Sequence, residues 1–228
     1  MDRAHRPPIL LAGTNNPHKL GEIRTLLSGL SVEVVGAEVL RESPAIEETG
    51  LTFEENARIK ARAFARAALK LSPERRPRLV VSDDSGLTVD ALEGAPGIHS
   101  ARFAGEPRCD RRNNEKLLSE LANVPAGRRG AAFVCALACA GVPEPGEEPR
   151  IRLEVRGECR GSIAEKAAGR GGFGYDPLFF VPDAGRTYAE LTEDEKNRLS
   201  HRGRAFARLA VLIRPLIDEQ ILLGSEKP

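Results

Sequence analysis

The sequence predicts an α/β fold, and three patterns along it lead to this prediction. Short apolar runs such as Ile9–Ala12 end in polar loops, as buried strands do. Apolar residues at helical spacing occupy other stretches, such as the one from Leu20 to Leu30. Strand and helix patterns are mixed along the whole chain, which favours the α/β class.

Further elements of the first half have recognisable boundaries. Thr52–Glu55 is a capping-box pattern that opens an Ala- and Arg-rich helix reaching about Leu71. The apolar run Leu79–Val81 predicts a buried strand that stops at the polar stretch Ser82–Gly86. Asp110 is placed to cap a further helix.

The second half predicts a hairpin, a third strand and a long helix. Thr192–Glu195 is a second capping box, and Pro215 is a candidate kink in the long helix. The predicted elements are the hairpin strands Ala131–Ala140 and Ile151–Val155 with their exposed turn Gly141–Arg150, the strand Leu178–Val181, and an amphipathic helix from about Ser200 to Leu222.

Composition excludes several classes of function. The 228 residues carry a net charge of +1, so no strong field favours DNA, RNA or an anionic membrane. The four cysteines form no C-x-x-C pair, which argues against a zinc site or a disulfide framework. No apolar run approaches the roughly 18 residues of a membrane span, and no signal peptide is recognisable. We therefore expect a cytoplasmic protein with no nucleic-acid or membrane partner.

The loop Gly13–Lys19 joins the first predicted strand to the first helix. Small residues before a helix N-terminus offer backbone N–H groups and a favourable dipole to an anion, and Lys19 adds a positive charge. The loop lacks the spacing of a Walker A motif. The residues alone leave open a phosphate-binding loop and an ordinary surface turn.

Two adjacent acids, Asp83 and Asp84, follow the apolar run Leu79–Val81. Adjacent side chains on an extended strand point to opposite faces, so we expect the two acids to have different roles. One of them is a candidate ligand for a hard cation such as Mg²⁺, and a polar strand-end turn is the alternative. Glu47–Gly50 supplies further carboxylates before a helix, although such a stretch is more often a solvated cap.

Two later segments are also candidates for ligand binding. In the Gly-rich loop Gly169–Asp176, Phe173 and Tyr175 could stack on a flat base, while a turn with two core aromatics is the alternative. The charge run Lys196–Arg202 is by itself typical of a solvated surface. If it forms one helix, Lys196 and Ser200 share a face.

These segments, in this order, resemble the inosine triphosphate pyrophosphatase family, also called the XTP/dITP diphosphatases. The resemblance extends from about Ile9 to Leu209. The matching stretches are Thr14-Asn15-Asn16-Pro17-His18-Lys19, Glu47–Phe53, Ser82–Leu87, Ala95–Arg102, Gly172–Pro177, Ala189–Lys196 and Ser200–Gly203.

The resemblance implies a particular form of the α/β fold: an elongated, twisted, mixed β-sheet with flanking helices, in two lobes around a central cleft, usually as a homodimer. We accordingly expect a flexible lead over residues 1–8, a single two-lobed domain over 9–222 and a tail over 223–228.

The resemblance also implies an activity, the Mg²⁺-dependent hydrolysis of ITP, dITP, XTP and dXTP to monophosphate and pyrophosphate. Glu48 and Asp84 would hold Mg²⁺, and Asp84 would be the catalytic residue that accepts a proton from the attacking water. The substrate-binding residues that the resemblance implies are Thr14, Asn15, Asn16, Pro17, His18, Lys19, Ser85, Phe173, Gly174, Tyr175, Asp176, Lys196, His201 and Arg202. Of these, Thr14, Asn16 and Lys19 would line the triphosphate and Ser85 would touch the substrate. Phe173, Gly174, Tyr175 and Asp176 would surround the base and sugar, Lys196 would lie on the nucleotide, and His201 and Arg202 would lie at the base edge.

Two other functions remain as alternatives. A Maf-like nucleotide pyrophosphatase would perform the same cleavage on other modified nucleotides. A non-catalytic nucleotide sensor or single-strand binder would bind without releasing pyrophosphate, although neutral charge and 4% aromatic content argue against a strand binder.

Overall fold

The computed structural model describes residues 7–225, with side chains described as far as residue 218. The predicted N-terminal lead therefore lies mostly outside the described residues. Of the predicted C-terminal tail, residues 223–225 continue the last helix, and residues 226–228 lie outside the described range.

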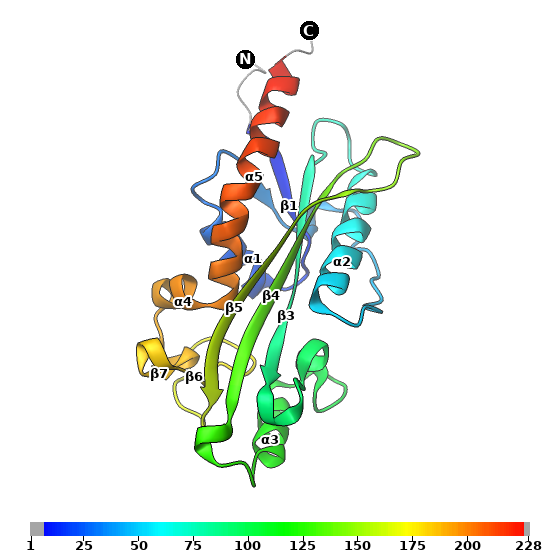
Figure 1. Cartoon of the computed structure of the whole chain (residues 1–228). Helices are drawn as coiled ribbons and strands as arrows, with labels where there is room; N and C mark the ends of the chain where they lie inside the picture. The colour runs from blue at the N-terminus through cyan, green and yellow to red at the C-terminus, as the bar shows by residue number, and fades with distance from the viewer. Residues whose placement is uncertain (1–6, 226–228) are drawn as a thin grey trace. The chain divides into compact units, whose positions relative to one another are not determined.

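The strands form one mixed sheet in the order β2-β1-β3-β4-β5-β6-β7 (Figure 1). Strand β1 pairs in parallel with β2 and β3, whereas β6 pairs antiparallel with both β5 and β7. The strands are β1 (Ile9–Ala12), β2 (Glu33–Val35), β3 (Leu79–Val89), β4 (Gly130–Gly141), β5 (Ile151–Ile163), β6 (Phe179–Val181) and β7 (Arg186–Thr187).

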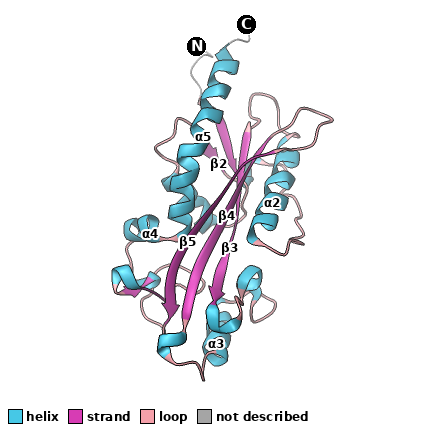
Figure 2. Ribbon diagram, viewed as in Figure 1, coloured by secondary structure: helices cyan, strands magenta, loops and turns pink. Residues whose placement is uncertain are grey.

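Helices separate the strands from β1 to β4, and two more helices follow β7, which confirms the predicted α/β class (Figure 2). The capping boxes at Thr52 and Thr192 are both present, each with reciprocal bonds to the glutamate three residues on. None of the helices in the described part of the chain is both long and apolar enough to cross a membrane. The α-helices are α1 (Pro17–Leu26), α2 (Phe53–Ala68), α3 (Asp110–Glu120), α4 (Glu193–Leu199) and α5 (His201–Ser225).

The described residues form two compact units. The first unit takes the chain up to Asp84, the stretch Ala136–Arg156, and the chain from Ala205 onward. The second unit consists of Ser85–Cys135 and Gly157–Arg204. Three long strands, β3, β4 and β5, therefore contribute residues to both units.

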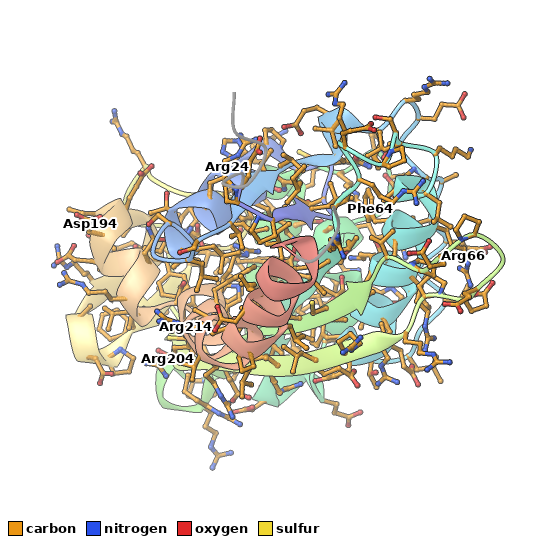
Figure 3. The ribbon with its side chains drawn as sticks, turned by 90° about the horizontal axis from the view of Figure 1, so that it is seen from above. Arg24, Phe64, Arg66, Asp194, Arg204 and Arg214 are labelled. Atoms are coloured by element: carbon orange, nitrogen blue, oxygen red, sulfur yellow. The ribbon has the colours of Figure 1, made fainter. Side chains whose placement is uncertain are left out.

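In the first unit, α2 carries one apolar face and one charged face. Ala57, Ala61 and Phe64 are buried at helical spacing within the helix that the sequence predicts. The charged face pairs with the hairpin of β4 and β5, and Figure 3 shows Arg66 beside the loop where it meets Glu148. Because such exposed pairs contribute little individually, burial of the apolar face mainly holds α2 in place.

The second unit has a core that includes most of its aromatic residues. Phe133, Phe179 and Tyr188 pack together with ring centroids 4.8–5.5 Å apart. Leu117 and Leu121 of α3 are fully buried in the same cluster. This core fixes α3 and the segment before β6, which carry residues discussed below.

Three local predictions are wrong. Strand β3 does not stop at the polar residues but runs on to Val89, because the carboxylates of Asp83 and Asp84 meet lysines and so remain buried within a central strand. Asp110 is the first residue of α3 and not its cap, which is Cys109. Ser200 has extended backbone (ψ 157°) and separates α4 from α5, so Lys196 and Ser200 do not share one helix.

Candidate active site

The loop after β1 is shaped by its own side chains. Asn16 caps α1, and its Oδ1 accepts from the N–H groups of His18 (2.9 Å) and Lys19 (3.3 Å). Thr14 Oγ1 accepts from the Asn16 N–H at 3.1 Å. Asn15 is exposed and accepts from Ser43 Oγ. The expected phosphate loop is thus an ordered turn, in which the Asn16 amide occupies two of the N–H groups that we expected an anion to use.

Lys19 points from the first turn of α1 to Asp83. Its Nζ lies 2.8 Å from Asp83 Oδ2, and the Asp83 side chain is almost completely buried. The parallel pairing of β1 with β3 brings the two together, since Gly13 N–H donates to the Val81 carbonyl at 2.8 Å just before them. Asp83 therefore holds the ammonium group of Lys19 at the end of the loop.

Asp84 contacts a different lysine, as the alternation of side chains on a strand predicts. Lys60 Nζ lies 2.6 Å from Asp84 Oδ1 and 3.2 Å from Glu48 Oε1. The same ammonium lies 3.3 Å from the backbone carbonyl of Asp83, and Asn56 Nδ2 approaches the other oxygen of Asp84 at 3.4 Å. One lysine of α2 therefore joins both predicted metal-binding carboxylates.

Sequence reasoning missed Lys60 and Asn56. A lysine in an Ala- and Arg-rich helix is usually solvated, so its residue type gave no signal. The available signal was position, because Asn56 and Lys60 are one helical turn apart and adjoin Ala57 and Ala61 on the buried face. A buried polar pair on an apolar helix face is the informative exception to hydrophobic patterning.

Burial and charge shift the pKa values of this group. Burial raises the pKa of Asp84 above its ordinary value, and the attraction of Lys60 only partly opposes this effect. Burial works to lower the pKa of Lys60, but Asp84, Asp83 and Glu48 outweigh it and raise the pKa. Lys60 therefore stays positively charged, and Asp84 is a more basic carboxylate than an exposed one.

The donor set around Asp84 fits a hard divalent cation. Mg²⁺ is commonly held by one or two carboxylates, with water and substrate phosphates completing its shell. Glu48 and Asp84 already share one cationic group, which shows that their oxygens converge. Within residues 7–225, no group of three or more His, Cys, Asp or Glu side chains is arranged to hold a metal ion. The two carboxylates of Glu48 and Asp84 are nevertheless of the ligand type that Mg²⁺ prefers.

In the second unit, Asp176 organises the Gly-rich loop. Its buried Oδ2 accepts from the Phe173 N–H at 2.9 Å and pairs with Lys196 Nζ at 2.7 Å. Lys196 Nζ also lies 5.0 Å from the centroid of the Phe173 ring. Phe173 is half-buried, so the loop presents an aromatic ring with a cation beside it.

Tyr175 occupies the core instead of offering a face to a ligand. It is buried in the aromatic cluster, and its hydroxyl donates to the Ser100 carbonyl at 2.8 Å. The core alternative therefore applies to Tyr175, whereas Phe173 is only half-buried. Gly174, between them, has φ +63° and is bonded through its backbone to α3.

The start of α5 is closely packed. The His201 ring stacks on Phe133 with a centroid distance of 4.8 Å, and both His201 and Arg202 are buried. Ser200 Oγ accepts from the Gly203 N–H at 3.0 Å, and a Cβ at Gly203 would lie 1.7 Å from the Asn197 carbonyl oxygen. Only glycine fits at position 203, because the backbone there lies against Asn197. This close contact helps to fix the positions of His201 and Arg202.

The expected site residues thus form two groups, one in each unit. The first group consists of Lys19, Asp84 and Glu48, beside the turn Thr14–His18, and the partners Asp83 and Lys60 join it in the structure. The second consists of Phe173, Asp176 and Lys196, and Tyr188 links them to His201 through ring contacts. Ser85 lies half-buried on β3 at the start of the second unit.

Comparisons with known proteins give consistent results. The family model described as the Ham1 family matches residues 10–212. A protein of Bacillus subtilis named dITP/XTP pyrophosphatase is 45% identical over 203 residues, covering 89% of this chain and 96% of that protein. A protein of Geobacillus kaustophilus with the same name is 46% identical over 200 residues, covering 88% and 91% of the two chains.

Solved structures agree with this result. The Ham1 protein of Staphylococcus aureus superposes with a TM-score of 0.75 at 38% identity, covering 91% of this chain and 99% of that one. The dITP/XTP pyrophosphatase of Mycobacterium abscessus superposes with a TM-score of 0.66 at 45% identity, covering 89% and 98%. The resemblance seen in the sequence motifs is confirmed, and the chain belongs to the Ham1 family.

Proposed function

We propose that this protein hydrolyses non-standard purine nucleoside triphosphates, dITP and XTP above all, to the monophosphate and pyrophosphate. The observation that carries the proposal is the double ion pair on consecutive residues, Asp83 with Lys19 and Asp84 with Lys60. It gathers two lysine cations and a basic carboxylate, which are the groups that phosphoryl transfer needs for charge neutralisation and water activation. The names of the similar proteins support the substrate class.

The reaction would use a divalent cation, for which we propose Mg²⁺ held by Glu48 and Asp84. Bound there, it would neutralise phosphate charge and help to orient the triphosphate. Lys60 contacts both carboxylates, so its ammonium is close enough to neutralise phosphate oxygens in the same place. Lys19, held by Asp83, would provide the second positive charge at the phosphates.

Asp84 would take the proton from the attacking water. Its raised pKa makes it a better base than an ordinary carboxylate, and Asn56 and Lys60 fix the orientation of its two oxygens. The turn Thr14–His18 would shape the path of the phosphate chain. We leave Asp83 outside the proton transfer, because its side chain is only 1% exposed, against 9% for Asp84.

We assign the base and sugar to the second group of residues. Phe173 would stack on the base, and Lys196 and the buried Arg202 and His201 would supply donors toward the purine edge. A donor aimed at a 6-oxo group discriminates against adenine, because a 6-amino group leaves that buried donor unpaired. Gly174, Asp176 and Ser85 would line the same region.

We further propose that the protein is a cytoplasmic homodimer whose only substrate partner is a nucleotide. Sedimentation velocity at micromolar concentration tests the dimer, and a single monomeric species would overturn it. Fractionation of cells expressing the tagged protein tests the location, with recovery in the membrane pellet as the contrary result.

Product analysis tests the activity. The enzyme with Mg²⁺ is offered dITP, XTP, dATP, dGTP and dCTP, and pyrophosphate is measured separately from orthophosphate. Pyrophosphate released preferentially from dITP and XTP is expected. Preferential release from a different modified nucleotide would favour a Maf-like substrate range, and tight binding without release would indicate a nucleotide sensor.

A further inference from the structure

Both backbone polar groups of Gly174 are bonded to side chains of helix α3. The Gly174 N–H donates to Asp110 Oδ2 at 2.6 Å, and its carbonyl accepts from Asn114 Nδ2 at 2.9 Å. Asp110 and Asn114 are one helical turn apart, so they lie on the same face of α3. Helix α3 therefore holds the peptide groups on both sides of the Gly174 Cα with one acceptor and one donor.

This contact lies in the middle of the loop that carries the proposed substrate residues. The neighbouring Phe173 N–H is bonded to Asp176, and the neighbouring Tyr175 side chain is bonded to Ser100. Gly174 has φ +63°, a conformation that glycine adopts without steric cost. The position of the Phe173 ring thus depends on backbone angles that the α3 contacts help to set.

Helix α3 is a rigid support for this purpose. Asn113 bonds the helix to the segment before it, accepting from the Ala104 N–H at 2.8 Å and donating to the Ala101 carbonyl at 3.2 Å. Leu117 is fully buried in the core of the unit. A helix anchored by packing and by hydrogen bonds holds its remaining polar side chains in defined positions.

We propose that Asp110 and Asn114 are positioning residues that hold the Gly-rich loop in the shape that presents Phe173 to the base. The inference rests on the proposed function for the identity of the ligand, and neither residue touches the nucleotide. For this role, the side chain at position 110 must accept a hydrogen bond, and the side chain at position 114 must donate one. Charge at position 110 is not required.

Steady-state kinetics on dITP test this demand with paired substitutions. Asp110→Ala and Asn114→Ala each lose one hydrogen bond and are expected to raise KM roughly threefold to tenfold, with kcat changed less than twofold. Asp110→Asn keeps an acceptor and is expected to stay within about twofold of the wild type. Asn114→Asp places an acceptor against the Gly174 carbonyl and is expected to be worse than Asn114→Ala.

A matched control lies on the same helix. Arg111 is exposed, and its side chain pairs with Glu115 on the same helix. Arg111→Ala therefore removes no bond to the Gly-rich loop and is expected to leave KM unchanged. Equal effects of Asp110→Asn and Asp110→Ala would show that charge matters and not the bond to Gly174, which overturns the proposal. Equal KM for wild type and both alanine variants would overturn it as well.

A second readout does not depend on turnover. The chain contains no tryptophan, so Phe173→Trp introduces a single indole into the loop. In that background, Asp110→Ala is expected to increase acrylamide quenching and lower the anisotropy of this indole, while Asp110→Asn and Arg111→Ala do not. No change on Asp110→Ala would contradict the proposal even if the enzyme is active. A clear change in a protein that hydrolyses none of the nucleotides would leave the positioning role standing and refute the proposed function instead.

Discussion

Lys60 Nζ lies 2.6 Å from Oδ1 of Asp84, and both side chains are largely buried. Burial raises the pKa of this carboxyl, and the positive charge of Lys60 opposes that effect and favours the ionised form of Asp84. The same lysine also pairs with Glu48, so one side chain contacts both proposed metal ligands.

Replacing Lys60 should move the pH dependence of the reaction. In Lys60→Met the opposing charge is lost, so the pKa of Asp84 rises further and the acidic limb of the profile of kcat/KM moves to higher pH. The free energy of unfolding should fall by about 1–3 kcal/mol, because a mostly buried carboxylate loses its partner. Rate measurements across the acidic range and urea unfolding check both effects. Arg24→Met, on an exposed pair, serves as the control, and an unmoved acidic limb in Lys60→Met would contradict the coupling.

Removing the proton acceptor should stop the chemistry and spare the fold. In Asp84→Asn we expect kcat to fall by about 10²–10⁴-fold, the range of a lost general base. Thermal unfolding should stay close to the wild type, because an amide at position 84 can still accept a hydrogen bond from Lys60. Single-turnover kinetics measure the chemical step directly. Full turnover in this variant would remove Asp84 from the mechanism.

Substitutions at the two aromatic residues of the Gly-rich loop should have different effects, on substrate binding at Phe173 and on stability at Tyr175. Phe173→Ala should raise KM by roughly 5-fold to 100-fold, because base stacking on an aromatic ring contributes about 1–3 kcal/mol. Tyr175→Phe loses only the bond to Ser100, so unfolding free energy should fall by about 1 kcal/mol with KM nearly unchanged. Kinetics and denaturation of both variants check the division. The reverse pattern, with KM raised only in Tyr175→Phe, would refute it.

The cysteines should differ widely in reactivity. Burial raises the pKa of Cys139 to about 12, whereas backbone N–H groups at the start of α3, that of Arg112 above all, lower the pKa of Cys109. At neutral pH an aromatic disulfide reagent should therefore modify Cys109 first and Cys139 only after unfolding. Peptide mass mapping of the labelled protein measures the order. Modification of Cys139 in the native protein would mean that β4 opens readily.

The fold could be predicted from patterns because its elements are strongly periodic and clearly bounded. Local sequence is enough to predict the helix starts at Thr52 and Thr192, because each carries a capping box. It is also enough to predict β4, because that strand is a long apolar run. Strand β3 could not be read in this way beyond Val81. Its polar residues are stabilised by Lys19 and Lys60, which are remote in sequence, so local pattern alone favoured a turn.

The candidate site could be predicted to a similar degree. The motifs identified the acids and the Gly-rich loop, and the alternation of side chains anticipated separate partners for Asp83 and Asp84. Contacts between segments that are distant in the sequence could not be predicted. In sequence, Lys60 looks like any lysine on the surface of a helix. The core position of Tyr175 involves a hydrogen bond from its hydroxyl to the carbonyl of Ser100, which is remote in sequence. Such relationships arise only when the chain folds.

The most direct test of the central claim is hydrolysis of dITP with Mg²⁺ in water enriched in oxygen-18, by the wild type and by Asp84→Asn. We expect the label to appear in dIMP and not in pyrophosphate, because water attacks the α-phosphorus, and we expect the variant to form almost no labelled dIMP. Label in pyrophosphate or in free orthophosphate would place the attack at another phosphorus. Labelled dIMP formed at full rate by Asp84→Asn would show that another residue activates the water.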